Sequence, residues 1–184
     1  MARVLVPLAP GCEELEAVTI IDLLRRARIE VVVAGLAGGP VKGSRGTVLV
    51  PDTTLESALA QDYDMVVLPG GQPGATNLEN DARVLALLKK MAAAGKYTAA
   101  ICAAPKVLAV AGLLDGKYAT SYPGAVDVTK FPRVRLETKA VVRDGAVLTS
   151  RGPGTAMDFA LTLIETLADR ATRDQVEAGL MRGD

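Results

Sequence analysis

The chain has 184 residues, of which 49% are hydrophobic and 23% charged, and its 21 basic side chains balance 21 acidic ones. This composition predicts one globular domain over residues 1–184, and the balanced charge gives no support for nucleic-acid binding. The sequence has no histidine and two cysteines, which excludes Ser-His-Asp and Cys-His catalysis and the usual metal sites. We therefore expect no metal and no other cofactor.

No apolar run reaches membrane-spanning length, and the first residues do not form a signal peptide. Two cysteines do not make a disulfide scaffold. We therefore expect a cytoplasmic protein that does not contact membranes.

Short apolar runs alternate with segments of helical periodicity along the chain. The expected strands are residues 3–7, 29–34, 65–68, 97–101 and 118–122, and the expected helices are residues 13–28, 54–60, 80–94, a segment from Pro105, 156–167 and 173–180. Residues 41–52 indicate a small hairpin or edge excursion, and residues 137–150 a hairpin around Asp144-Gly145. This alternation predicts an α/β fold with a mainly parallel sheet, in which ligands bind beyond the carboxyl ends of the strands.

Cys102 lies where a predicted strand meets a predicted helix. Ala100 and Ala104 flank it at minus two and plus two, and Pro105 suits the first turn of the helix. This is the small-x-nucleophile-x-small pattern of a nucleophile elbow, and a thiol near a helix N-terminus is favoured as thiolate. A buried structural cysteine would equally account for the stretch.

The first predicted helix carries Leu15, Val18, Ile21 and Leu24 at the spacing of one apolar face. Glu16 lies in its first turn, where acidic residues commonly complement the helix dipole. If Glu16 instead faces a pocket, burial would raise its pKa and make it an acid or base beside Cys102.

Other loops at the same edge of the sheet offer further groups. Gly70 and Gly71 follow a predicted strand and, with the N–H of Ala103, could form an oxyanion hole, although a plain turn explains them as well. The loop at 151–154 suits an anion or a simple turn, and Thr155 is placed to cap the following helix. Cys12, in the loop after the first strand, could be exposed, and we interpret it as incidental.

Four segments in this order resemble the ThiJ/PfpI superfamily, most closely its branch with the Parkinson-disease-associated protein deglycase and bacterial YajL. They are residues 11–17 (GCEELEA), 67–71 (VLPGG), 100–105 (AICAAP) and 149–155 (TSRGPGT). The resemblance implies a flavodoxin-like three-layer sandwich and a homodimer. It makes Cys102 the nucleophile and Glu16 its protonated partner, with Gly71 and Ala103 as oxyanion donors.

The resemblance also implies a pocket beside Cys102. Ser44 and Arg45 match a serine-arginine pair of the family, Gly70 lies next to the donors, and Arg26 matches an arginine that approaches from the dimer partner. Tyr122 stands where many members have a histidine. YajL-like members also lack that histidine, and its absence argues against protease activity.

The activities implied are those of the family. They are glyoxalase or deglycase action on α-oxoaldehydes (methylglyoxal, glyoxal) or their adducts on proteins, chaperone activity, and an oxidative stress response through a cysteine sulfinic acid. We expect an enzyme. The alternative is a redox-sensing chaperone whose cysteine is oxidised without dedicated turnover.

Overall fold

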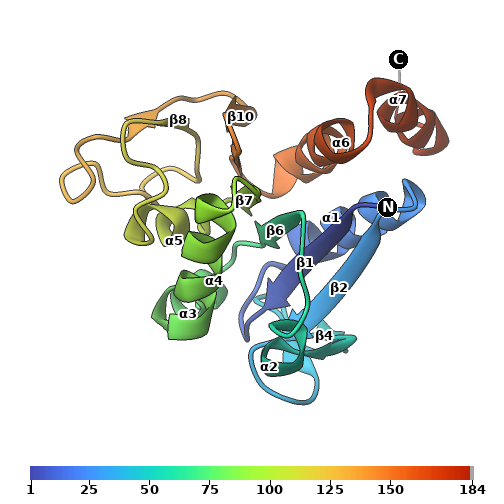
Figure 1. The fold of residues 1–184 in the computed structure, drawn as a ribbon, viewed down its shortest axis with the longest axis horizontal. Coiled ribbons are helices and arrows are strands. Elements are labelled where there is room, and N and C mark those ends of the chain that lie inside the picture. Colours follow the sequence, from blue (N-terminus) through green and yellow to red (C-terminus); the bar gives the residue numbers. More distant parts are fainter. Residues whose placement is uncertain (183–184) are drawn as a thin grey trace.

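A central sheet of seven strands organises the protein, and a computed structural model describes residues 1–182 of it. The strand order is β10-β11-β7-β6-β1-β2-β5, and every neighbouring pair is parallel except β10 with β11. The strands are β1 (Arg3–Leu8), β2 (Glu30–Gly35), β5 (Thr53–Thr54), β6 (Met65–Leu68), β7 (Tyr97–Ile101), β10 (Val141–Asp144) and β11 (Val147–Ser150). The five long parallel strands have the flavodoxin-like order 2-1-3-4-5. The predicted fold class is confirmed (Figure 1).

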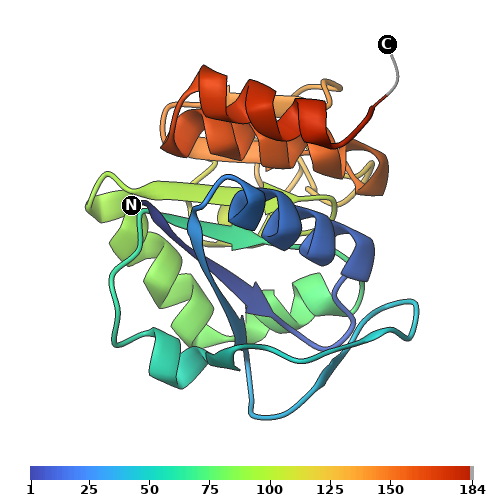
Figure 2. The same ribbon diagram turned by 90° about the vertical axis from the view of Figure 1, so that its right-hand side faces the viewer.

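Helices cover both faces of this sheet (Figure 2). One face carries α1 (Glu14–Arg26), α6 (Ala156–Leu167) and α7 (Arg170–Gly179), and the other carries α2 (Leu55–Ala58), α3 (Gly74–Asn80), α4 (Ala82–Ala93) and α5 (Pro105–Val110). Alternate residues of a strand point to opposite faces, so Val4 and Val6 enter one apolar core and Leu5 the other. Burial on both faces explains why these strands are continuous apolar runs.

Two small sheets and a single helical turn complete the described residues. The predicted hairpin after β2 forms from β3 (Val41–Lys42) and β4 (Val48–Leu49), which are antiparallel. The second small sheet pairs β8 (Tyr118–Ala119) with β9 (Arg135–Leu136) in parallel, and η1 is a 3₁₀ turn at Pro153–Thr155. No helix within residues 1–182 is long and apolar enough to cross a membrane.

Two sequence predictions need correction, and one helix was missed. The strand expected at residues 118–122 ends at Ala119, because the backbone N–H of Tyr122 is bonded to Cys102 instead. Helix α3 was not predicted, since its seven residues begin with glycine and show no clear apolar period. Thr155 does not cap α6, because its hydroxyl bonds to Gly152 and Ser150.

The inward face of α1 also differs from the predicted one. Leu15 and Val18 are 51% and 48% exposed, whereas Glu16, Ile20 and Leu24 are fully buried. The helix is therefore turned so that a carboxyl, and not only apolar side chains, enters the protein.

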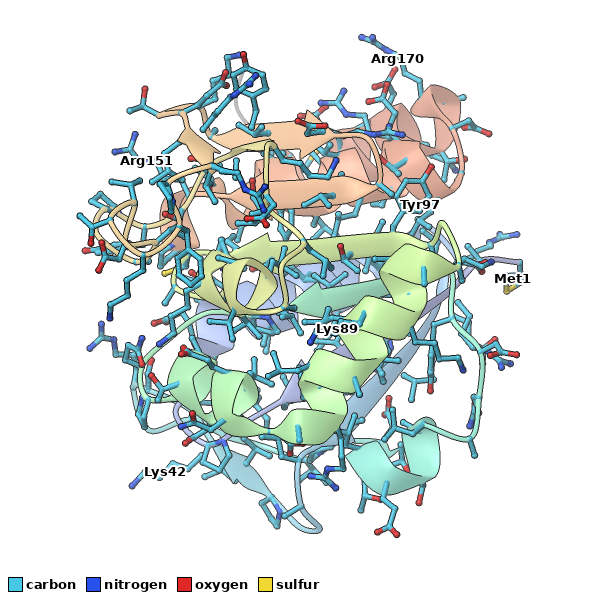
Figure 3. The ribbon with its side chains drawn as sticks, turned by 60° about the vertical axis from the view of Figure 1, so that its left-hand side comes forward. Met1, Lys42, Lys89, Tyr97, Arg151 and Arg170 are labelled. Atoms are coloured by element: carbon cyan, nitrogen blue, oxygen red, sulfur yellow. The ribbon has the colours of Figure 1, made fainter. Side chains whose placement is uncertain are left out.

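The carboxyl ends of the parallel strands lie at one edge of the molecule. Arg151, which follows β11, lies at that edge in Figure 3, and Tyr97, which begins β7, lies at the opposite edge. The loops after β1, β6, β7 and β11 meet at the first of these edges and form the candidate site.

Candidate active site

Cys102 has a left-handed backbone conformation at the end of β7, with a φ of +62°. This region is unfavourable for a residue other than glycine. Two backbone hydrogen bonds hold it there: the Cys102 N–H donates to the Ser150 carbonyl at 2.9 Å, and the Cys102 carbonyl accepts the Tyr122 N–H at 2.8 Å. Pro105 then begins α5. The predicted sharp turn from strand to helix is thus present, with a side chain that is only 8% exposed.

The two glycines after β6 are required because their loop packs directly against the elbow. A Cβ atom on Gly70 would lie 2.7 Å from the Cβ of Cys102 and 2.9 Å from the nitrogen of Ala103. Gly71 has a φ of +87°, and a Cβ there would lie 2.3 Å from the nitrogen of Glu13. Without side chains, this loop can bring its N–H groups to the sulfur.

Glu16 is fully buried and faces the elbow, so it is not a solvated partner of the helix dipole. Its Oε2 accepts the N–H of Gly70 at 2.8 Å, and its Oε1 has no hydrogen-bond partner at standard distance. Burial raises the pKa of Glu16 to about 7, against the lowering effects of the Gly70 N–H and the neighbouring Cys102 thiol.

The pKa of Cys102 is raised to about 12, first by burial and then by the negative charge of Glu16. The backbone N–H groups of Gly71 and Ala103 lower this pKa but do not offset the rise. The position of Cys102 near a helix N-terminus predicted a lowered thiol pKa. That prediction is wrong, because burial and the charge of ionised Glu16 raise the pKa instead. Because both pKa values are raised, the two groups together hold one proton on the alkaline side of neutrality, and a thiolate exists when that proton is on Glu16.

A cavity of about 330 Å³ opens beside Cys102. Its lining residues are Glu13, Ser44, Arg45, Gly71, Gln72, Cys102, Ala103, Tyr122 and Pro153. The structure thus brings Ser44, Arg45 and Tyr122 of the predicted pocket residues to Cys102. Gly70 and Glu16 lie behind the cavity wall. Glu13, Gln72 and Pro153 were not singled out in the sequence, although each lies in a loop or first turn that was.

Glu14 holds one wall of this cavity in place. Its Oε1 accepts the N–H groups of Arg45 at 2.9 Å and Thr47 at 3.1 Å, and its Oε2 accepts the Ser44 hydroxyl at 3.2 Å. Burial would raise the pKa of Glu14, but these donors and its own N–H lower it to about 2. Glu14 therefore stays ionised and fixes the residue 43–47 turn against α1.

Comparison with known proteins identifies the family. The family model described as DJ-1/PfpI matches residues 2–166. The chain belongs to the DJ-1/PfpI family. It is 46% identical to protein dj-1beta of Drosophila melanogaster over 96% of this chain and 95% of the relative. It is 35% identical to the glutathione-independent glyoxalase DJR-1.2 of Caenorhabditis elegans over 90% of this chain and 88% of the relative.

Solved structures show the same fold. The crystal structure of Drosophila melanogaster DJ-1beta superposes with a TM-score of 0.93 at 43% identity, covering 100% of this chain and 99% of that one. Oxidised Toxoplasma gondii DJ-1 superposes with a TM-score of 0.92 at 39% identity and full coverage of both chains.

Arg26 does not line the Cys102 cavity of its own chain. Its guanidinium is paired with Asp22 at 2.6 Å, and it lines a different cavity of about 550 Å³ between the end of α1 and α7. The Arg151 guanidinium donates to the carbonyl of Thr138 at 2.9 Å. The arginine of the 151–154 loop is therefore used in a hydrogen bond within the chain.

Cys12 is not exposed, although its position in a loop allowed that. Its side chain has 0% exposure, and burial raises the pKa of its thiol to about 11. The two cysteines of this chain therefore differ in their access to a ligand: Cys102 lines the 330 Å³ cavity, and Cys12 does not. Within residues 1–182, no group of three or more His, Cys, Asp or Glu side chains is arranged to hold a metal ion.

Proposed function

We propose that this family member is a cysteine-dependent enzyme that converts α-oxoaldehydes such as methylglyoxal and glyoxal, or their adducts on proteins. The observation that carries the proposal is the buried Glu16 carboxyl beside Cys102 in a chain with no histidine. This pair supplies a nucleophile and one mobile proton. The name of the nematode relative, a glyoxalase that does not need glutathione, supports the same chemistry.

The first step uses the elbow. The Cys102 thiolate attacks the aldehyde carbon, a carbon–sulfur bond forms, and the carbonyl electron pair moves to the oxygen. The N–H groups of Gly71 and Ala103 already interact with the sulfur, so they are placed to stabilise that oxyanion. Protonated Glu16 is the acid that can neutralise it, giving a hemithioacetal.

The second step moves a proton between two carbons. Glu16, now a carboxylate, removes the proton on the former aldehyde carbon and returns one to the neighbouring carbon through an enediol. The first carbon is oxidised to a thioester and the second is reduced to an alcohol, so no external oxidant takes part. Water then hydrolyses the thioester, which gives lactate from methylglyoxal and restores the Cys102 thiol.

The cavity fits this substrate class. A volume of about 330 Å³ accommodates a small dicarbonyl compound and leaves an open mouth for a substituent. A cysteine–histidine protease is not supported, since the chain has no histidine. The proposal also places the protein in the cytoplasm, a reducing compartment that keeps a nucleophilic cysteine as the free thiol.

The test is lactate formation from methylglyoxal by the purified protein without glutathione. Wild type and Cys12→Ser should be active, and Cys102→Ser should be inactive. An inactive wild type, or activity that survives in Cys102→Ser, would refute the proposal.

A second candidate, a redox-sensing chaperone, is favoured by the same donors around the sulfur. The N–H groups of Gly71 and Ala103 and a protonated Glu16 can hold the oxygens of a Cys102 sulfinate, and one structural neighbour is described as oxidised. Mild peroxide should add two oxygens to Cys102 and leave the buried Cys12 unmodified, by peptide mass spectrometry. Oxidation shared equally by both cysteines, or unchanged by Glu16→Leu, would count against this candidate.

A further inference from the structure

A row of side-chain contacts runs from α5 to the wall of the Cys102 cavity. The Lys106 ammonium is 2.9 Å from the Glu79 carboxylate and donates to the Thr76 hydroxyl, also at 2.9 Å. The Thr76 hydroxyl in turn contacts Oε1 of Gln72 at 2.9 Å. Gln72 lines the cavity, and Lys106 lies on α5, the helix that the elbow begins.

The direction of every hydrogen bond in this row follows from the chemistry of Lys106. An ammonium group only donates, so the Thr76 oxygen must accept from it. The single hydroxyl proton of Thr76 is then available to Gln72, and it can only go to an acceptor. The Gln72 amide is therefore oriented with its oxygen toward Thr76, and its NH₂, which only donates, lies on the other side of the amide carbon.

The ammonium end of this row is partly buried, whereas its Gln72 end is exposed. The Lys106 side chain is 19% exposed and the Glu79 side chain 29% exposed, so water competes weakly for the ammonium, while the hydrogen bond between Thr76 and Gln72 lies at the surface. Thr76 lies within α3 and Gln72 four residues before it, just ahead of the helix.

We propose that Lys106 is a positioning residue that sets the polarity of the Gln72 amide, so that Gln72 presents hydrogen-bond donors to the second oxygen of the substrate. This inference rests on the proposed function. An α-oxoaldehyde has two adjacent carbonyl oxygens, and the N–H groups of Gly71 and Ala103 serve the one that Cys102 attacks. Gln72 serves the other, which favours dicarbonyl compounds over simple aldehydes.

The kinetic test compares kcat/KM for methylglyoxal among variants. Lys106→Met, Thr76→Val and Gln72→Leu should each lower it by about three- to tenfold, the usual effect of one hydrogen bond. Lys106→Arg keeps a positively charged group that can only donate, so its kcat/KM should stay close to that of wild type. Lys96→Met is the matched control, because it also breaks an ion pair, with Asp64 at 2.8 Å, away from the cavity.

The decisive comparison is the double variant. In the Gln72→Leu background, Lys106→Met should cost nothing further, because Lys106 acts through Gln72. Fully additive losses, or no rescue by Lys106→Arg, would overturn the proposal and leave Lys106 as a structural residue only.

A measurement that does not depend on turnover separates this inference from the proposed function. Pyruvate, a stable compound with two adjacent carbonyls, should shift the NMR signals of the Gln72 side-chain amide in wild type and in Lys106→Arg. The shift should be much smaller in Lys106→Met. An equal shift in Lys106→Met, or none in wild type, refutes the role of Lys106 even if lactate is formed. The expected shifts in a protein without turnover would refute the proposed enzyme alone.

Discussion

At the scale of single residues, the Cys102–Glu16 pair decides the pH dependence of activity. Below the raised pKa of Glu16, about 7, both groups are protonated and no thiolate exists. Above it the pair holds one proton, and the reactive form with a thiolate and a protonated carboxyl becomes accessible. We expect kcat/KM to rise with pH through about 7 and to stay level to the alkaline limit of stability, since the second proton leaves only near pH 12. A profile that falls between pH 6 and pH 8 would contradict this.

Stability should change in the opposite direction over the same range. The folded pKa of Glu16 is about 7, above its value in an unfolded chain, so the folded state binds more protons between the two values. The free energy of unfolding therefore decreases as pH rises toward 7, by about 3 kcal/mol for a shift of this size. Glu16→Gln should remove this dependence in chemical denaturation series, with Glu13→Gln as the control on the same turn.

Tyr122 provides a contrasting prediction. Its side chain is 53% exposed, and its contact with the elbow is made by the backbone N–H. A phenol is also a poor base at neutral pH. Tyr122→Phe should keep most of the methylglyoxal activity, whereas Glu16→Gln should lose about a hundredfold or more, the usual effect of a positioned general base. Steady-state kinetics decides: equal losses in the two variants would make the phenol catalytic.

At the scale of elements, the hairpin of β3 and β4 depends on one carboxylate of α1. A Cβ on Gly43 would lie 2.6 Å from the Glu14 carboxyl, so the turn is closely fitted to it. Because the pKa of Glu14 is lowered to about 2, its contribution is complete above the ordinary pKa of about 4.5 and is lost as pH falls toward 2.

Glu14→Gln should therefore loosen the residue 43–47 turn, because the amide NH₂ cannot accept the backbone donors. We expect a loss of about 1–3 kcal/mol in the free energy of unfolding at pH 7, the range for charged hydrogen bonds. Faster hydrogen exchange should be confined to the N–H groups of Arg45 and Thr47. Unchanged exchange at both positions would show that Glu14 does not hold the turn.

The sequence predicted most elements because their local patterns agree with the fold. Continuous apolar runs marked the buried strands, and the Ala-rich turn before Pro105 marked the elbow. The phase of α1 was not predictable in the same way, since Leu15 and Val18 fit a helical apolar face as well as Ile20 and Leu24 do. The periodicity left the side chain of Glu16 open, the family resemblance implied that it faces Cys102, and the hydrogen bond from Gly70 shows that it points inward. The thiol pKa likewise depends on burial and on a charge from a distant element, which no local pattern contains.

At the scale of the whole molecule, the residues that stabilise the fold and the residues that form the candidate active site lie in different places. Both apolar cores lie between the sheet and its helices, whereas the cavity is lined by residues that follow β1, β6, β7, β8 and β11 or belong to the first hairpin. This arrangement is common in open α/β sheets, where side chains at the strand ends can vary without disturbing the core. The groups that tune the Cys102 pKa therefore come from separate parts of the chain: Glu16 from α1, Gly71 from the loop after β6, and Ala103 from the elbow itself.

The exposed face of α1 leads to the last prediction, that the protein is a homodimer. Leu15 and Val18 are 51% and 48% exposed one turn apart, and Val48 and Val50 of the first hairpin are 57% and 79% exposed. Leu24, which the sequence periodicity put on the same helix face as Leu15 and Val18, is buried. We expect light scattering at micromolar concentration to give twice the chain mass of 19.1 kDa.

The variant Val18→Asp should shift the protein to the monomer, because a charge at the centre of an apolar interface is costly to bury. Val110→Asp is the matched control, since Val110 is a 40% exposed apolar residue on α5, on the other face of the sheet. If wild type is monomeric, or if both variants dissociate alike, α1 does not form the interface. In that case Arg26 cannot approach the Cys102 cavity of a second subunit through this surface.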